Sequence, residues 1–184
     1  RPRASARTSN GEDEWRRLLK LFAAKGVECR EVDSESQISV AEMELKIVYP
    51  LGKNPAPPGT PENNLSLIAK LSTQDGNIWI TGDSPTSNEK TAMGTIPTNL
   101  QGGLLLVPHH GSLSSSSNTL LTSIRPTVAV VSHQRDIPSK IAKRYEHHRI
   151  PLCGTTPGGT VQIRLHQRKI FLPMGCSWES APPK

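Results

Sequence analysis

Two short apolar runs that end on metal-binding residue types constrain this chain more than any other feature. The first is residues 77–83 (NIWITGD), and the second is residues 104–112 (LLLVPHHGS). Runs of aliphatic and β-branched residues closed by a polar, Gly-containing loop predict buried strands that end at the rim of a sheet. Asp83 at one end, with His109 and His110 at the next, offers oxygen and nitrogen ligands that suit zinc or a similar divalent ion.

Each half of this pattern also has a structural explanation. Thr-Gly-Asp after a strand is common in turns, because Gly and Asp favour the backbone conformations that turns require. A His-His pair is often a surface feature. The two motifs lie about 26 residues apart and each terminates an apolar strand. The combination favours a metal site, but the residues alone leave both interpretations open.

Composition places the chain among ordinary globular proteins. Its 184 residues are 34% hydrophobic and 21% charged, which is typical of one domain. No run approaches the roughly 18 apolar residues that a membrane span needs, and no segment has the pattern of a signal peptide. The net charge of +6 favours an anionic partner such as DNA, although basic residues spread over every face would only aid solubility. Cys29, Cys153 and Cys176 are too scattered for a disulfide framework, so we expect two buried thiols and one in a tail.

The chain predicts alternating helices and strands within one domain. We expect a mobile lead-in at residues 1–11, a domain over 12–172 and a tail at 173–184. Trp15, Leu18, Leu19 and Phe22 have helical spacing and predict core contacts of a first helix. The expected elements are helices near 12–26, 87–93, 117–124 and 138–148, strands near 27–32, 43–49, 65–71, 78–80, 104–107 and 128–131, and a hairpin over 160–172. A Pro-rich loop at 51–62 interrupts them.

The serine run after His110 is interpreted as a tight turn followed by a helix N-cap at Ser116 or Ser117. A helix start presents free N–H groups that favour anions. The loop is therefore a candidate site for a phosphate group beside the metal.

Several motifs together resemble one protein family. They are residues 63–71 (NNLSLIAKL), the Asp75-Gly76 turn, residues 78–83 (IWITGD) and residues 107–112 (VPHHGS) with serines behind. This arrangement resembles the C-terminal domain of the ComEC DNA-uptake proteins over roughly residues 12–170. The resemblance implies a metallo-β-lactamase fold, an α/β (α+β sandwich) architecture with a mixed sheet flanked by helices. It also implies nuclease-type action on incoming DNA during natural transformation, in a soluble domain of an inner-membrane parent on the extracytoplasmic side.

The chain departs from the family pattern at several places. The His-x-His-x-Asp-His motif of metallo-β-lactamase folds does not occur, and the sequence begins at Arg1 without an initiator Met. Leu65 stands where the family tends to carry Asn, and residues 134–138 (QRDIP) stand where it tends to carry a Gly-His-Pro-His-like loop. We therefore expect the C-terminal portion of a larger domain, either a fragment or a lineage that has lost the motif, with an incomplete metal site.

The resemblance implies roles for individual residues. Asp83 matches the aspartate that bridges two metals, zinc or manganese, and His110 is assigned as a ligand, with the choice between His110 and His109 left open. His133 is either a further ligand or a hydrogen-bonded residue at the rim. The remaining assignments are His109 as the catalytic or substrate-contacting residue and Ser112, Lys140, Lys143 and Arg144 as substrate-binding residues.

The sequence is consistent with two functions. The first is a metal-dependent phosphodiesterase domain that acts on DNA and is inactive as this fragment. The second is a metal-free degenerate domain that binds DNA or stabilises its parent transporter.

Overall fold

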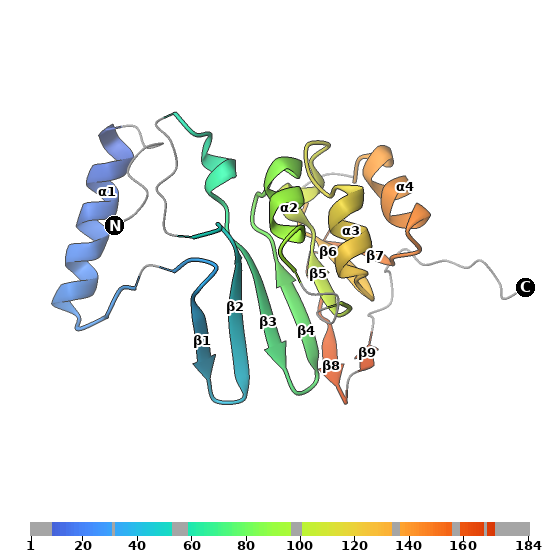
Figure 1. Ribbon diagram of the computed structural model, residues 1–184, viewed down its shortest axis with the longest axis horizontal. Helices are drawn as coiled ribbons and strands as arrows, with labels where there is room; N and C mark the ends of the chain where they lie inside the picture. The colour runs from blue at the N-terminus through green and yellow to red at the C-terminus, as the bar shows by residue number, and fades with distance from the viewer. Residues whose placement is uncertain are drawn as a thin grey trace, which may run out of the picture.

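The computed structural model describes residues 9–30, 32–52, 59–96, 101–133, 137–155, 159–167 and 169–171 (Figure 1). Its helices are α1 (Ser9–Ala24), α2 (Thr86–Met93), α3 (Asn118–Ile124) and α4 (Ser139–His147), with 3-10 turns η1 (Glu62–Leu65) and η3 (Pro108–Gly111). Its strands are β1 (Gln37–Val40), β2 (Met43–Tyr49), β3 (Ile68–Thr73), β4 (Gly76–Ile80), β5 (Leu104–Leu106), β6 (Val128–Val131), β7 (Leu152–Gly154), β8 (Arg164–His166) and β9 (Lys169–Phe171). In this part of the chain, no helix is long and apolar enough to cross a membrane.

Seven strands form one mixed sheet in the order β1 to β7. Strands β1 to β4 are antiparallel neighbours, whereas β4 to β7 run parallel and are connected through α2, α3 and α4. Parallel neighbours need such crossovers, because a tight turn reverses the strand direction. The predicted α/β fold, a mixed sheet flanked by helices, is confirmed.

The predicted hairpin of β3 and β4 forms through the Asp75-Gly76 turn. The Thr73 hydroxyl oxygen accepts hydrogen bonds from the N–H groups of Asp75 (3.2 Å) and Gly76 (3.1 Å). These local bonds fix the register, which pairs Lys70 with Trp79. The hairpin thereby positions β4, the strand that leads to Asp83.

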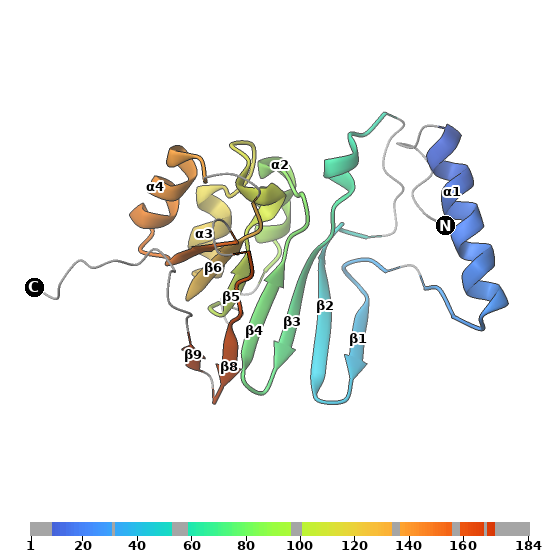
Figure 2. The same cartoon turned by 180° about the vertical axis from the view of Figure 1, so that it is seen from behind.

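The main core lies between the sheet and the helices α2, α3 and α4, which Figures 1 and 2 show grouped over β4 to β7. The sheet contributes a row of side chains in register across the four parallel strands: Trp79, Leu105, Ala129 and Leu152, each at most 4% exposed. The helices contribute Met93, Leu120, Leu121, Ile124, Ile141 and Tyr145. This packing holds the ends of β4, β5 and β6 in fixed positions.

The opposite face of the sheet is apolar along its whole width. One row in register across six strands consists of Ile38, Leu45, Leu71, Ile78, Leu104 and Val128. Val161, Ile163 and Ile170, from the segment that includes the β8–β9 hairpin, cover the end of this face at Leu104 and Val128. At the other end Ile38 is 39% exposed and Val40 59% exposed. This face is therefore only partly covered by the residues that the structure describes.

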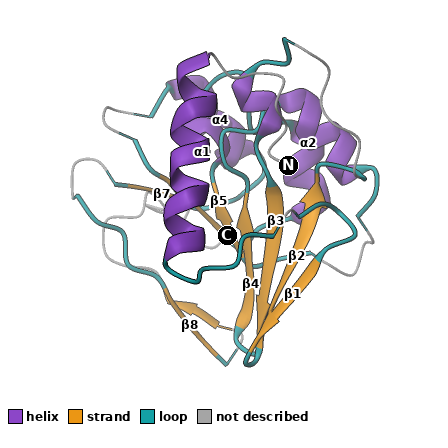
Figure 3. Cartoon of the chain, turned by 90° about the vertical axis from the view of Figure 1, so that its left-hand side faces the viewer, coloured by secondary structure: helices purple, strands orange, loops and turns teal. Residues whose placement is uncertain are grey.

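The first helix forms as predicted but does not contribute to the core. It begins at Ser9, within the predicted lead-in, and lies beyond β1, apart from the other helices (Figure 1). Figure 3 views the molecule from the side on which α1 lies. Trp15, Leu19 and Phe22 are half-buried, and Leu18 is exposed. The predicted core contacts are wrong, because none of these four residues belongs to a core cluster of the described residues.

Two strand assignments also differ from the sequence-based expectation. The predicted strand at 27–32 is wrong, since its described residues are irregular, and β1 lies at Gln37–Val40 instead. Strand β7 was not predicted, because three residues are too short to give a period-two signal. Residues 53–58 of the Pro-rich loop and the predicted tail at 173–184 lie outside the described residues.

The cysteines differ from the expected buried thiols. Cys29 is free and exposed. Cys153 is buried in β7 and is disulfide-bonded. Cys176 lies outside them as well.

Candidate functional site

The loops that follow β4 and β5 meet at one edge of the sheet. The Thr81 hydroxyl donates a hydrogen bond to the Leu106 carbonyl (2.6 Å), and the His109 N–H donates to the Gly82 carbonyl (2.9 Å). Ligand sites of parallel sheets characteristically lie at the carboxyl ends of the strands. The two motifs singled out in the sequence, Thr-Gly-Asp83 and Pro-His-His-Gly-Ser, are therefore neighbours in space.

Asp83 and His110 face each other across this edge. The distance between Asp83 Oδ1 and His110 Nε2 is 3.6 Å, and the side chains are 44% and 62% exposed. His110 Nδ1 lies 2.9 Å from the Ser132 carbonyl oxygen, at the end of β6. Because a carbonyl only accepts, Nδ1 carries the proton, and in the neutral ring the lone pair is on Nε2, the atom that faces Asp83.

His109 has a different environment. Its Nε2 lies 3.2 Å from the Asn63 amide nitrogen, and its Nδ1 is buried without a hydrogen-bond partner in the described part of the structure. The residue is half-buried, and Asn63 lies against the second ring nitrogen. Its catalytic role therefore stays a prediction.

The turn that carries both histidines has an unusual backbone. His109 (φ 50°), His110 (φ 51°) and Gly111 (φ 76°) all have left-handed conformations. A left-handed residue other than glycine costs about 1–2 kcal/mol, so surrounding contacts must hold this turn in place. A Cβ at Gly111 would lie 3.3 Å from Val131 Cγ2, so this position also leaves little space for a side chain.

Residues 112–117, hereafter the serine turn, follow directly and are held by a buried carboxylate. Glu89 of α2 is fully buried and accepts hydrogen bonds from the N–H groups of Ser116 (2.7 Å) and Ser117 (2.6 Å). Ser117 caps α3 as predicted, accepting from Leu120 N–H (3.1 Å). Glu89 thus takes up two N–H groups that directly precede α3, and the predicted phosphate site at this helix start stays a prediction.

Helix α4 holds the other side of the serine turn. Arg144 Nη1 donates to the carbonyls of Ser115 (2.6 Å) and Ser116 (2.9 Å), and the Tyr145 hydroxyl lies 3.0 Å from Ser116 Oγ. Burial raises the pKa of Tyr145 well above its ordinary value, so the phenol stays protonated. The serine turn is therefore bound through its N–H groups to α2 and through its carbonyls to α4.

The predicted substrate-binding residues are placed differently from one another. Lys140 and Lys143 are exposed on α4. Arg144 is half-buried, and its guanidinium binds the serine turn. Ser112 Oγ forms a hydrogen bond with Ser114 Oγ (3.0 Å). None of these contacts tests DNA binding, so these four assignments stay predictions.

His133 lies close to this edge, one residue beyond Ser132. Its N–H donates to Thr155 Oγ1 and its carbonyl accepts from the same hydroxyl, each at 3.1 Å. Over the described ranges, no group of three or more His, Cys, Asp or Glu side chains is arranged to hold a metal ion.

Sequence reasoning missed Glu89, Ser115 and the Ser132 carbonyl. Glu89 lies in a short, weakly apolar helix, where an acidic residue is normally solvated. Asn63 lies in the NNLSLIAKL motif of residues 63–71, but its contact with His109 spans 46 positions in the chain and has no local signal.

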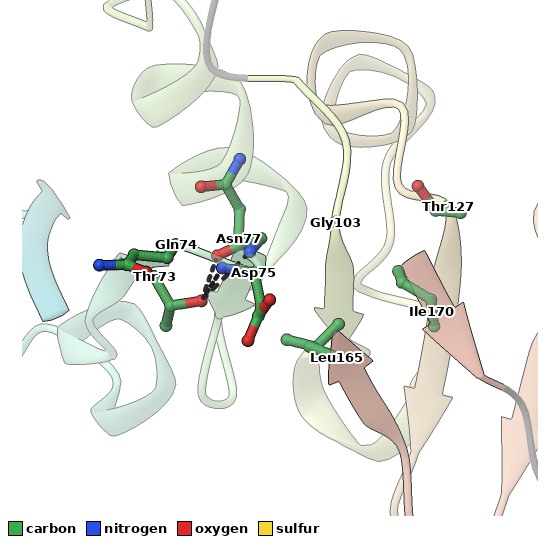
Figure 4. Close-up of a pocket in the computed structure, with 9 residues that line it drawn as sticks. Thr73, Gln74, Asp75, Asn77, Gly103, Thr127, Leu165 and Ile170 are labelled. Atoms are coloured by element: carbon green, nitrogen blue, oxygen red, sulfur yellow. Dashed lines mark hydrogen bonds between the residues drawn. The ribbon is translucent and has the colours of Figure 1, made fainter. Parts of the chain in front are cut away.

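A polar cleft of about 450 Å³ lies at the opposite end of the sheet (Figure 4). The β3–β4 turn lines one side, and Leu165 and Ile170 of the hairpin line the other. Asp75 Oδ1 accepts a hydrogen bond from Gln167 N–H (2.6 Å) and so ties the two hairpins together. The cleft does not include the Asp83–His110 pair.

No family model matches this chain, but several known proteins are similar to it. ComE operon protein 3 of Bacillus subtilis (strain 168) is 27% identical over 166 residues, which are 87% of this chain and 20% of that protein. Competence protein ComA of Neisseria gonorrhoeae is 28% identical over 109 residues, which are 56% of this chain and 16% of that protein. Recombination protein 2 of Haemophilus influenzae is 27% identical over 114 residues, which are 59% of this chain and 14% of that protein.

The chain thus spans a fifth or less of each of these three relatives. The metallo-β-lactamase fold that the resemblance implies stays a prediction. The comparisons support a relationship between this chain and the competence proteins of the ComEC type.

Proposed function

We propose that this chain forms part of a DNA-uptake protein and contributes to a metal-dependent phosphodiesterase centre that acts on incoming DNA. One observation carries the proposal, the 3.6 Å approach of Asp83 Oδ1 to a His110 Nε2 whose lone pair is set by the Ser132 carbonyl. Metal-binding histidines commonly donate their second ring nitrogen to a carbonyl in this way. The similarity to competence proteins supports DNA as the substrate.

The residues at this site fit a divalent ion. Two ligand atoms at about 2.1 Å from one ion, at a near-tetrahedral angle, are about 3.4 Å apart. The distance between Asp83 Oδ1 and His110 Nε2 is 3.6 Å, so zinc or manganese would be held through these two atoms. When bound, such an ion supplies Lewis-acid chemistry that neutralises charge developing on a phosphodiester.

The protein's own residues have separable roles in this proposal. Asp83 keeps its second oxygen available for another ion or a proton. His110, oriented by the Ser132 carbonyl, supplies Nε2 as a ligand. His109, held by Asn63, contacts substrate. Exposed Lys140 and Lys143 attract the phosphate backbone, a sequence-independent contribution that weakens with salt. Further ligands come from outside the described residues.

The partly covered apolar face supports a metallo-β-lactamase-like sandwich. Over β4 to β7 the sheet is apolar on both faces and needs a layer on each side, and helices cover one of these faces. The hairpin segment covers only one end of the other face. We propose that a second sheet from the same polypeptide covers the remainder, over β1 to β4.

We also propose that the parent is membrane-embedded and that this domain lies on the extracytoplasmic side. The disulfide bond of Cys153 supports that side, because disulfides persist in oxidising compartments and are rare in the cytosol.

A second function is favoured by the small number of ligands. Asp83 and His110 form a pair, and no third side chain joins them within the described ranges. A metal-free degenerate domain, which binds DNA or stabilises its parent transporter without hydrolysis, would have this arrangement.

Zinc binding and nuclease assays separate the two functions. We expect the purified chain to bind zinc weakly, to lose this binding in Asp83→Ala and His110→Ala, and to keep it in the control Asp75→Asn, at the far end of the sheet. DNA cleavage by the chain alone should be poor, because two or three ligands do not complete a two-metal site. Strong manganese- or zinc-stimulated cleavage that Asp83→Ala abolishes would refute the fragment interpretation. Absence of zinc binding by both the chain and its full-length parent would support the degenerate domain.

A further inference from the structure

The serine turn is connected to the backbone that precedes the two histidines. Ser115 is fully buried, and its hydroxyl oxygen lies 2.8 Å from the Pro108 carbonyl and 2.8 Å from the Ser112 carbonyl. One hydroxyl has one proton, so the two carbonyls share it. Ser115 therefore spans the turn, from the residue before His109 to the second residue after His110.

The position of Ser115 is itself fixed by charged groups. Its carbonyl accepts from Arg144 Nη1 (2.6 Å), and the next two N–H groups donate to the Glu89 carboxylate. Both charged groups bind backbone atoms of the turn, and the Ser115 hydroxyl is the side chain that extends the connection to the Pro108 carbonyl. A continuous set of hydrogen bonds thus runs from Glu89 through the serine turn to the Pro108 carbonyl.

We propose that Glu89 and Ser115 are positioning residues for His110, which hold its left-handed turn so that Nδ1 meets the Ser132 carbonyl and Nε2 faces Asp83. The role as support for a metal ligand rests on the proposed function. The strained backbone at His109 and His110 persists only while surrounding contacts determine it. On the side that follows His110, these contacts are the hydrogen bonds of the serine turn.

A general structural role would predict a different result. If Glu89 and Ser115 only stabilised the fold, their replacement would lower the melting temperature but leave the His110 ring unchanged in the folded protein. If they position His110, the ring loses its fixed partner while the protein remains folded. The tautomer of His110 distinguishes these outcomes, since it reports which ring nitrogen carries the proton.

The test uses the metal-free chain and two matched pairs of variants. Ser115→Ala is compared with Ser114→Ala, the same change at an exposed position, and Glu89→Gln is compared with Glu146→Gln, which is also exposed. Ring nitrogen shifts are recorded by long-range ¹H–¹⁵N correlation at pH 8, with His110 assigned from its loss in His110→Ala. Folding is verified by far-UV circular dichroism. If Glu89→Gln does not fold, Ser115→Ala decides the question.

We expect the wild type and both controls to show His110 mainly with the proton on Nδ1. Ser115→Ala and Glu89→Gln should move at least a third of the population to the Nε2-protonated form and lower zinc affinity about tenfold, the usual scale for groups that orient a ligand. An unchanged tautomer in the folded variants would overturn the proposal, as would a changed tautomer with unchanged zinc affinity. If the wild type binds no zinc, the proposed function fails, and the tautomer alone still decides whether these residues position His110.

Discussion

Replacing Gly111 by alanine should destabilise the protein through two effects that a second glycine separates. Gly111 has a φ of 76°, and an added Cβ would lie 3.3 Å from Val131 Cγ2. Gly102 has a φ of 85°, and an added Cβ there would meet nothing within 4 Å. Gly102→Ala therefore measures backbone strain alone, whereas Gly111→Ala adds crowding against β6.

The expected magnitudes follow from this difference. Strain at a left-handed alanine costs about 1–2 kcal/mol in either variant. Crowding a buried methyl group by a few tenths of an ångström adds about 1–3 kcal/mol at Gly111. We therefore expect Gly111→Ala to lower the free energy of unfolding by about 2–5 kcal/mol, and Gly102→Ala by about 1–2 kcal/mol.

Urea unfolding followed by tryptophan fluorescence and far-UV circular dichroism measures both values. A double-mutant cycle with Val131→Ala isolates the crowding, because removing the Val131 methyl groups should recover about 1 kcal/mol or more of the Gly111→Ala loss. Losses equal within about 0.5 kcal/mol for the two glycine variants, together with no coupling to Val131, would refute the steric argument.

Three further predictions concern the candidate site and a buried charge. In the proposed full-length parent, His110→Ala should lose zinc that His109→Ala keeps, as measured by metal content after dialysis; the reverse result would exchange their assignments. Replacing Lys140 and Lys143 by Gln should reduce the log–log salt slope of DNA binding by about 1–2 units, measured by fluorescence anisotropy, and an unchanged slope would remove α4 from the interface. Lys70→Met should raise the free energy of unfolding at pH 7 by up to about 1 kcal/mol, because Lys70 is 6% exposed; equal stability of the two proteins at pH 7 would contradict this.

The Lys70 prediction has a defined pH dependence. Burial lowers the pKa of the Lys70 ammonium from its ordinary 10.5, with Glu44 opposing and Lys46 adding to the shift. Between the lowered pKa and 10.5 the unfolded chain binds more protons, so wild-type stability rises with pH in that window. The advantage of Lys70→Met should therefore be complete below the lowered pKa and shrink as the pH approaches 10.5. Unfolding free energies measured at pH 7 and pH 10 test this change.

Elements with a strong local pattern were predictable. Strands β3 to β6 and helices α2 to α4 have a clear period, a turn dipeptide or a cap, and each was found within a few residues of its predicted limits. Strand β1 was missed although its residues QISV alternate polar and apolar types, because four residues give only a short period-two signal. Helix α1 was predicted, but its contacts were not, because amphipathic spacing specifies a face and not the surface that it packs against.

The sequence by itself determined which residues end the two central strands. A run of apolar residues stops where a polar loop begins, and that boundary is local, so Asp83 and the two histidines could be placed at a sheet edge. Only the tertiary structure decided which histidine faces Asp83, because that depends on the Ser132 carbonyl and on a left-handed turn. It also decided that the Glu89 carboxylate binds the N–H groups of Ser116 and Ser117, just before α3. A buried carboxylate and the N–H groups that satisfy it are 27 positions apart or more, and no local pattern encodes such a contact.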